Sequence, residues 1–450
     1  MTARVHIVGA GLAGSLLAVF LARRGLDVLV LERRPDMRRE DIPAGRSINL
    51  ALANRGLAAL ARVGLEEDVR RLTISMRGRM LHDERGALQL VPYGQQPHEV
   101  IHSISRAGLN RLLMDAAEAT GRVELRFNER VETMDLASGT LEVHDERGGE
   151  PARIAGAPVI AADGAGSRIR DALMATPGAR VTEDLLPHDY KELNIPPDAD
   201  GSHAMEKHAL HIWPRGGYML IALPNLDGSF TVTLFLPREG TDSFATLDSP
   251  RAVHDFFTRV FPDAVPLMPE LVESFFANPT GHMVTVRCTP WNLADRALLI
   301  GDAAHAIVPF HGQGMNAAFE DCGELDRCLD AHGADWARAF AEFTRLRKPN
   351  AEAIADMALE NYVEMRDAVR NPRFQLQKAL AFELERRHPG VFIPRYSMVM
   401  FHHMPYAQAR DRGAIQQRIL DALTADASTL DDIDLDAADD MVERELRPTI

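Results

Sequence analysis

The spacing of apolar residues divides the chain into three regions with different predicted elements. Near the N-terminus, short apolar runs at 5–8 and 28–31 flank a helical run, as in parallel α/β units. Residues 123–160 alternate apolar and polar positions like strands, and residues 205–237 form another strand-rich block, which predicts a sheet unlike the parallel one and hence a second domain. From Pro349 onward the pattern is mostly helical. The pattern therefore predicts an α/β fold with a separate β-sheet domain and a helical C-terminal region.

A glycine motif lies inside the first apolar region. Residues 5–22 could be mistaken for a membrane span or signal peptide, but they contain Gly9, Gly11 and Gly14 in the spacing G-x-G-x-x-G. In such a motif the first glycine makes a tight turn, the second admits a pyrophosphate, and the third lets helix pack on strand. The second predicted strand is closed by Glu32, whose carboxylate can accept hydrogen bonds from an adenosine ribose. The order strand, helix, strand, acid predicts a dinucleotide site.

A second candidate site lies in residues 297–322. An apolar run at 297–300 predicts a buried strand that ends at Gly301 and Asp302, which places a carboxylate at the edge where open α/β sheets bind ligands. Gly312 and Gly314 then precede a predicted helix, and backbone without β-carbons at a helix N-terminus can approach a ligand closely. A plain connector would explain the glycines but not the acid.

A possible zinc motif lies in residues 98–102. His98, Glu99 and His102 match the zinc-protease pattern H-E-x-x-H, but Pro97 and the β-branched residues that follow oppose the helix that zinc binding requires. Zinc is therefore not expected.

A capped helix is predicted directly after this motif. Ser105 can cap a helix over 106–119. Arg106 lies in the first turn of that helix, and a cation there favours a nearby anion such as a pyrophosphate.

Composition narrows the class of protein. The chain has 450 residues, 46% hydrophobic and 26% charged, enough for two or three globular domains. Its net charge of −15 argues against a nucleic-acid partner, because phosphate binding needs clustered basic surface. The cysteines, Cys288, Cys322 and Cys328, have neither metal nor redox spacing and give no disulfide framework, which favours the cytoplasm. No membrane anchor is inferred, and a homodimer is kept as an option because the sequence does not set the oligomeric state.

Taken in order, these motifs resemble a known family. The glycine motif with Glu32, then Arg106, then Asp163 within Ala-Asp-Gly, then Asp302 after Gly301 resemble the single-component flavoprotein aromatic hydroxylases. Longer blocks, among them GRSINLAL, ISRAGLNRLL, IWPRGGYMLIALPN and GDAAHAIVPFHGQGMNAAFEDC, are similar to the kynurenine-hydroxylating branch of that family. The resemblance implies an FAD-binding Rossmann-like domain (1–72, 99–175 and 287–345) interleaved with a β-sheet substrate domain (73–98 and 176–286). A helical C-terminal region (346–450) would complete the substrate pocket.

The resemblance also implies an activity and its residues. The enzyme would use NADPH and O2 to hydroxylate L-kynurenine to 3-hydroxykynurenine through a flavin hydroperoxide. FAD would be bound by Gly9, Gly11, Leu12, Ala13, Gly14, Glu32, Arg33, Arg106, Asp163, Asp302, Gly312, Gly314, Met315 and Asn316. The substrate's amino-acid end would meet Arg79, Tyr93, Asn361 and Tyr396, and its ring would meet Leu210, Met219, Leu223, Phe235, Pro309, Phe310 and Met365, with His311 beside the flavin.

Alternatives stay open at this point. From the residues alone, Arg79 and Tyr93 would be a surface arginine and a half-buried aromatic. A related flavin hydroxylase of another aryl amino acid or an anthranilate-like ring is the nearest alternative enzyme. A protein that holds flavin without turnover is an alternative of another class. The eukaryotic relatives carry a membrane anchor that is not found in this sequence, so membrane attachment is not expected.

Overall fold

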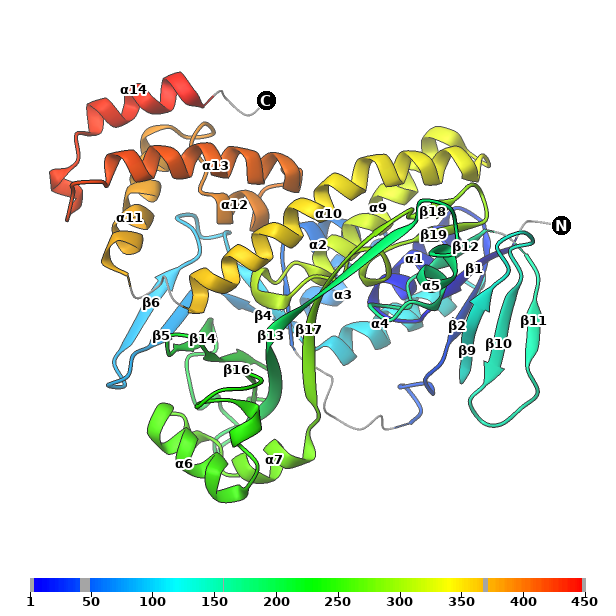
Figure 1. Cartoon of the computed structure of the whole chain (residues 1–450), viewed down its shortest axis with the longest axis horizontal. Helices are drawn as coiled ribbons and strands as arrows, with labels where there is room; N and C mark the ends of the chain where they lie inside the picture. The colour runs from blue at the N-terminus through cyan, green and yellow to red at the C-terminus, as the bar shows by residue number, and fades with distance from the viewer. Residues whose placement is uncertain (1–3, 41–48, 157, 367–370, 447–450) are drawn as a thin grey trace.

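A six-stranded, mostly parallel sheet carries the first glycine motif (Figure 1). The computed structural model describes residues 4–40, 49–156, 158–366 and 371–446. The sheet has the order β18 (Asn292–Leu293), β19 (Ala297–Leu299), β12 (Val159–Ala161), β1 (Arg4–Val8), β2 (Asp27–Glu32) and β8 (Val123–Phe127). Only the pair β18 and β19 is antiparallel among these described strands. The parallel strands read as nearly continuous apolar runs because they are buried on both faces.

A layer of three helices packs beside this sheet, with α1 (Leu12–Arg23) between α4 (Arg106–Ala119) and α9 (Gly314–His332). Every residue of α1 from Gly14 to Ala22 is buried, which explains why the segment is apolar on all sides. Ser105 caps α4, as predicted, by accepting a hydrogen bond from Gly108 N. None of the helices in the described part of the chain combines the length and the apolar character needed to cross a membrane.

A seven-stranded sheet forms the second region, in the order β17 (Thr280–Thr289), β13 (Arg180–Ile195), β16 (Phe230–Pro237), β15 (Met219–Pro224), β14 (Ala209–Pro214), β5 (Gly78–His82) and β6 (Leu88–Pro92). Its two faces have different neighbours because side chains alternate along a strand. Leu220 and Ala222 pack in a core with α6 (Pro250–Val260) and α7 (Leu271–Ala277). Met219, Ile221 and Leu223 point the other way, into a cavity.

Two three-stranded sheets complete the β-structure. One has the order β3 (Leu50–Leu52), β7 (Ile101–Ile104), β4 (Thr73–Met76), and the other β11 (Ala152–Ile154), β10 (Leu141–Asp145), β9 (Glu129–Met134). His102 belongs to β7, whereas His98 and Glu99 precede it outside any helix. The H-E-x-x-H pentapeptide is therefore not helical, as its proline and β-branched residues predicted.

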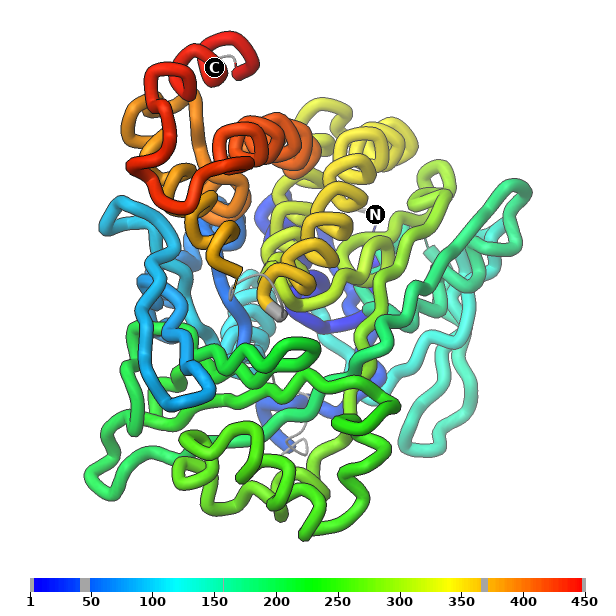
Figure 2. The backbone as a smooth tube through the Cα atoms, turned by 60° about the vertical axis from the view of Figure 1, so that its left-hand side comes forward, coloured from blue at the N-terminus to red at the C-terminus, as the bar shows by residue number. Residues whose placement is uncertain are grey.

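The C-terminal region is helical, and Figures 1 and 2 place it at one end of the molecule, above the β5–β6 hairpin. It contains α11 (Pro372–Arg387), α12 (Arg395–Met400), α13 (Tyr406–Leu423) and α14 (Leu435–Glu445). The long helix α10 (Trp336–Arg366) leads into it and passes through Pro349 without ending. The predicted division at 345 and 346 thus falls inside a helix. The predicted fold class, α/β with an interleaved second sheet and a helical C-terminal region, is confirmed.

Candidate active site

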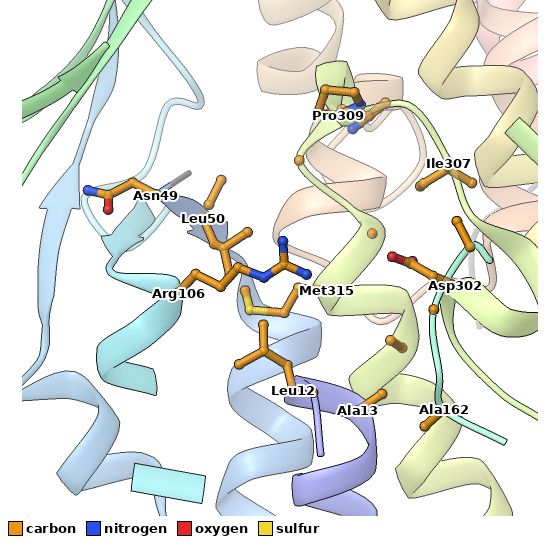
Figure 3. A pocket seen from close by; sticks show the side chains of 18 of the residues that line it. Leu12, Ala13, Asn49, Leu50, Arg106, Ala162, Asp302, Ile307, Pro309 and Met315 are labelled. Carbon is orange, nitrogen blue, oxygen red and sulfur yellow. The ribbon is translucent and has the colours of Figure 1, made fainter. Parts of the chain in front are cut away.

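One cavity of about 660 Å³ runs between the two large sheets and joins the glycine motif to the seven-stranded sheet. Figure 3 shows its side chains arriving from several separate elements, among them Leu12 and Ala13 of α1, Arg106 of α4, and Asp302. Its size is within the range of cavities that hold cofactors and small substrates. The cavity has two halves: a nucleotide-like half beside the glycine motif, with charged side chains, and an apolar half against the seven-stranded sheet.

The N-terminus of α1 opens into the cavity. Gly9 has a positive φ of 98°, and a Cβ there would lie 2.6 Å from the carbonyl oxygen of Ala162, so the turn requires glycine. A Cβ at Gly11, in contrast, would meet no described atom within 4 Å. No side chain among the described residues caps this helix end. Its free N–H groups and positive dipole end therefore suit a diphosphate.

Glu32 lies at the end of β2 on the same cavity wall. Its carboxylate accepts hydrogen bonds from Ala10 N at 2.8 Å and from Arg34 N and Nε at 3.0 and 2.8 Å. Burial alone would raise the pKa of this carboxyl, but the contacts with Arg34 and Ala10 lower it below its usual value. Glu32 is therefore ionised at neutral pH and keeps lone pairs for further donors such as ribose hydroxyls.

The second glycine stretch forms the opposite wall. Asp302 begins the short helix α8 (Asp302–His305) at the end of β19, and the turn η3 (Pro309–His311) follows. Gly314 and Met315 line the cavity at the N-terminus of α9, where no described side chain caps the helix at Gln313. A second uncapped helix end thus faces the same cavity and favours negative charge there.

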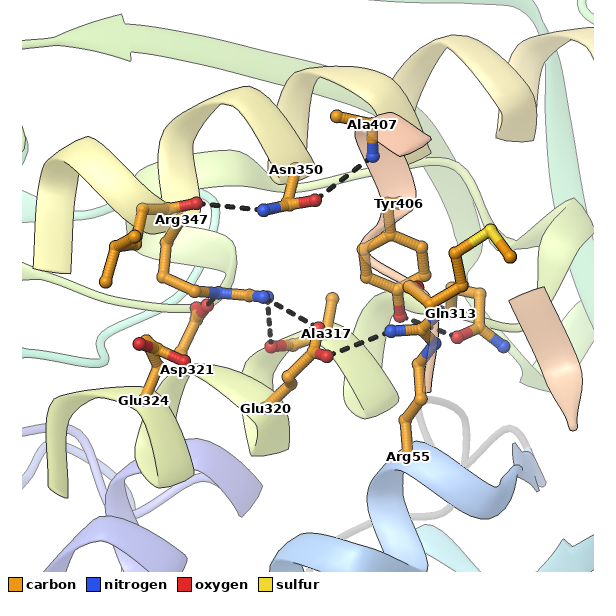
Figure 4. Close-up of polar contacts among 12 residues, drawn as sticks. Arg55, Gln313, Ala317, Glu320, Asp321, Glu324, Arg347, Asn350, Tyr406 and Ala407 are labelled. Carbon is orange, nitrogen blue, oxygen red and sulfur yellow. Dashed lines mark hydrogen bonds and ion pairs between the residues drawn. The ribbon is translucent and has the colours of Figure 1, made fainter. Parts of the chain in front are cut away.

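A buried ion network holds this wall in place (Figure 4). Asp321 accepts hydrogen bonds from Gly301 N at 2.9 Å, His305 Nε2 at 2.6 Å and Arg347 Nε at 2.7 Å. Burial alone would raise the pKa of Asp321, but His305 and Arg347 lower it to about 2. Arg347 also binds Glu320, which pairs with Arg55 at 2.9 Å. The network therefore connects α2 (Asn54–Arg62), α9 and α10 beside the Gly301–Asp302 turn.

Tyr406→Phe is expected to lower the free energy of unfolding by about 1–3 kcal/mol, because a buried acceptor loses its donor. The Tyr406 hydroxyl, fully buried, donates to Gln313 Oε1 at 2.7 Å and so connects α13 to the start of α9. Urea denaturation of the two proteins measures the change. An unaltered midpoint would mean that Gln313 finds another donor.

The apolar half of the cavity is built by strand register. Leu210 on β14 pairs with Arg79 on β5, and Met219 on β15 pairs with Phe235 on β16. All four line the cavity. Because side chains alternate along a strand, Ile221 and Leu223 of β15 point to the same side as Met219 and line the cavity too. The result is a hydrophobic wall with one cation at its edge.

Arg79 is buried at 7% exposure, beside the rings of Tyr93 and Tyr396, which stack on each other. Its Cζ lies 4.9 Å from the centre of the Tyr396 ring and 5.8 Å from that of Tyr93. Among the described residues, Arg79 Nε and the Tyr93 hydroxyl have no hydrogen-bond partner. Its nearest carboxylate, Glu364, is 3.8 Å away, beyond a hydrogen bond. The expectation of a surface arginine and a half-buried tyrosine is wrong, and a buried cation with unused donors suits an anionic ligand.

His311 is buried beside this cation. Its ring stacks on that of Tyr396, with centroids 5.4 Å apart. Burial, together with the charges of Arg395 and Arg79, lowers the pKa of His311 to about 3. The imidazole is therefore neutral at neutral pH, which fits a packing or hydrogen-bonding role.

All but three of the predicted site residues line this cavity. A Cβ at Gly14 would lie 2.0 Å from Gly9 O, so this glycine supports the turn from behind. The Asn316 amide donates to Ala51 O and Gly312 O, and Asn361 Nδ2 donates to Phe310 O at 2.5 Å. The two asparagine side chains, from α9 and α10, therefore stabilise the backbone of the cavity wall and do not line the cavity themselves.

Some lining residues escaped the sequence reasoning. Figure 3 shows Asn49, Leu50 and Ile307 on the cavity surface, and Arg130 and Met400 also line it. Asn49, Leu50 and Ile307 lie in blocks that resemble the family but were assigned no role there, since an apolar side chain resembles any core position. Residues 45–48 of the GRSINLAL block lie outside the described residues.

Comparison with known proteins agrees with this geometry. Residues 2–358 match the FAD binding domain family. The chain is 52% identical over 444 residues to a kynurenine 3-monooxygenase of Myxococcus xanthus (strain DK1622), covering 99% of this chain and 96% of the relative. It is 49% identical over 444 residues to the kynurenine 3-monooxygenase of Stenotrophomonas maltophilia (strain K279a), covering 98% and 97%.

Solved structures share the fold at low identity. The tetrameric form of 2-methyl-3-hydroxypyridine-5-carboxylic acid oxygenase superposes with a TM-score of 0.68 at 20% identity, covering 85% of this chain and 98% of its own. The p-nitrophenol 4-monooxygenase PnpA from Pseudomonas putida DLL-E4 gives 0.65 at 20% identity, covering 86% and 94%.

Proposed function

The chain belongs to the kynurenine 3-monooxygenase family, whose members contain an FAD binding domain, and we infer that it hydroxylates L-kynurenine at ring position 3. FAD is its cofactor, and NADPH and O2 are its co-substrates. One observation supports this function most directly: a single cavity leads from the open N-terminus of α1 to the buried, incompletely paired Arg79.

The residues of the nucleotide half fit FAD. Gly11 leaves room for a diphosphate at the end of α1, Glu32 offers acceptors for the adenosine ribose, and Asp302 would bind the ribityl chain. Arg106 lines the same space and would contact the flavin. The chemistry that FAD supplies when bound is the activation of O2 with electrons from NADPH.

The apolar half would orient and shield the substrate. Arg79, with Tyr93 and Tyr396 around it, would bind the carboxylate of the amino-acid end. The aromatic ring would then lie along the apolar wall formed by Met219, Phe235 and their neighbours, which offers water few hydrogen-bond partners. Binding at one end thus fixes which edge of the ring is presented to the cofactor.

The substrate's electronics fit a pocket without a base. Electrophilic oxygen attacks ring carbons made electron-rich by a donor, and in kynurenine the neutral ring amine is that donor. A phenol would first have to give up a proton to a general base. His311 is the titratable imidazole of this wall, and it is neutral and buried. We therefore assign it packing and positioning.

We expect the purified protein to convert L-kynurenine to the 3-hydroxy product, with oxygen beside the amine, and His311→Phe to keep this regiochemistry with a modest loss of rate. NADPH consumption with a panel of aryl amino acids measures substrate choice, and proton NMR of the product gives the position. Wild type under identical conditions is the reference.

Four outcomes would contradict parts of this function. Hydroxylation para to the amine would overturn the binding orientation. A His311→Phe variant that holds FAD but is inactive would give the histidine a catalytic role. Faster NADPH consumption with another aryl amino acid or an anthranilate-like ring would favour the alternative substrate class. An FAD-bound protein that consumes NADPH with none of these compounds would hold flavin without turnover.

We also propose a cytoplasmic location. All three cysteines are buried as free thiols, and burial raises the pKa of Cys288 to about 11. Such thiols are chemically quiet and fit a reducing compartment.

A further inference from the structure

A second charged side chain, Glu364, lies beside Arg79, next to the residues that line the cavity. Glu364 lies on α10, and its Oε1 is 3.8 Å from Arg79 Nη1. The acids that line the cavity among the described residues, Glu32, Glu129, Asp163 and Asp302, all belong to the nucleotide half. Glu364 is thus the carboxylate that the structure offers next to Arg79.

Glu364 and Asn361 lie close together on α10. Glu364 stands in the last described turn of this helix, which the structure describes as far as Arg366. Asn361 is one turn earlier on the same face, and its Nδ2 already donates to Phe310 O. The Asn361 carbonyl oxygen is therefore the group that this amide can offer to a further donor.

One protein cation already lies near this carboxylate. Lys378 of α11 interacts electrostatically with both Glu364 and Arg79, and burial with the charge of Arg79 lowers its pKa to about 8. Glu364 could therefore serve only to balance Arg79 and Lys378. If that were its role, removing the charge of Glu364 would change the affinity of every carboxylate ligand equally. A role in binding a ligand's ammonium group would change only the affinity of ligands that carry one.

We infer that Glu364, assisted by Asn361, binds the α-ammonium group of the amino-acid substrate while Arg79 binds its carboxylate. This inference rests on the proposed function, because it concerns the same cavity and a zwitterionic substrate. A carboxylate, an ammonium and a ring held at three separate places define one configuration at the α-carbon. Glu364 would therefore set the preference for the L-amino acid over its mirror image and over a ligand without the amine.

Glu364→Gln tests this assignment because it removes the charge and keeps the shape. Kd values of the FAD-loaded protein are measured by calorimetry for L-kynurenine, D-kynurenine and the desamino analogue 4-(2-aminophenyl)-4-oxobutanoate. We expect the Kd of L-kynurenine to rise about tenfold, as for loss of a charge-assisted hydrogen bond. The preferences for L-kynurenine over D-kynurenine and over the desamino analogue should both fall by a similar factor. Glu352→Gln, at an exposed position on the same helix, is the matched control.

Two other results of this experiment would contradict the role of Glu364. Equal fold-changes for all three ligands would overturn the assignment and make Glu364 a counter-ion of Arg79. Unchanged Kd values would place the ammonium elsewhere and also overturn it. If wild type binds none of the three ligands, the proposed function itself fails. If wild type binds L-kynurenine but Glu364→Gln leaves the preferences among the three ligands unchanged, only the role of Glu364 fails.

Discussion

Gly11→Val is expected to give a folded protein that purifies colourless and has no hydroxylase activity. Gly11 has a φ of −73°, which any residue can adopt, and a Cβ there would meet no described atom within 4 Å. The fold should therefore accept the change. The valine side chain would instead occupy the space in which a diphosphate approaches the N-terminus of α1. Flavin absorbance per mole of protein measures the loss, and circular dichroism checks the fold.

Gly14→Val provides the contrast within the same motif. Its Cβ would lie 2.0 Å from the carbonyl oxygen of Gly9, so this variant should damage the fold itself. A protein with Gly11→Val that stays yellow with an unchanged FAD affinity would show that the nucleotide site lies elsewhere.

Arg79→Met is expected to lower kcat/KM for L-kynurenine by an amount equivalent to about 2–5 kcal/mol, because the substrate carboxylate would be buried without its charged partner. Methionine keeps much of the length of the side chain and its packing beside Tyr93 and Tyr396. FAD content should stay the same, since Arg79 lies in the apolar half of the cavity. Steady-state kinetics and flavin absorbance measure the two quantities.

Tyr396→Phe is expected to have a smaller effect on kcat/KM than Arg79→Met. It removes one hydroxyl and keeps the ring that stacks on Tyr93 and His311, so the expected loss is closer to about 1 kcal/mol. The order of the two effects is the test. Small and equal losses in both variants would mean that the carboxylate is not bound by Arg79.

Much of the nucleotide half could be predicted because its signals are local in the sequence. Gly9, Gly11 and Glu32 fall within one β-α-β unit, whose backbone geometry is set by neighbouring residues. The same holds for Asp302 after β19 and for the glycines before α9. The cap at Ser105 and the extended form of His102 also followed from short-range preferences.

The apolar half of the cavity was decided by tertiary structure. Read without the family resemblance, Arg79 looked like a surface residue, and its burial comes from β5, Tyr93 and Tyr396, which are far apart in the chain. The pairing of Leu210 with Arg79 depends on a parallel register between distant strands, which periodicity does not specify.

Helix α10 illustrates the same limit. The sequence pattern predicted a mostly helical region from Pro349 onward, whereas α10 already begins at Trp336 and continues through Pro349. It packs against α9 and α13 and carries Asn361 and Glu364 toward Arg79. By itself the sequence determined the elements and the glycine motifs, because backbone sterics and hydrophobic periodicity act over a few residues. Which side chains meet across the cavity depended on long-range packing, because contacts between distant segments form only when the layers come together.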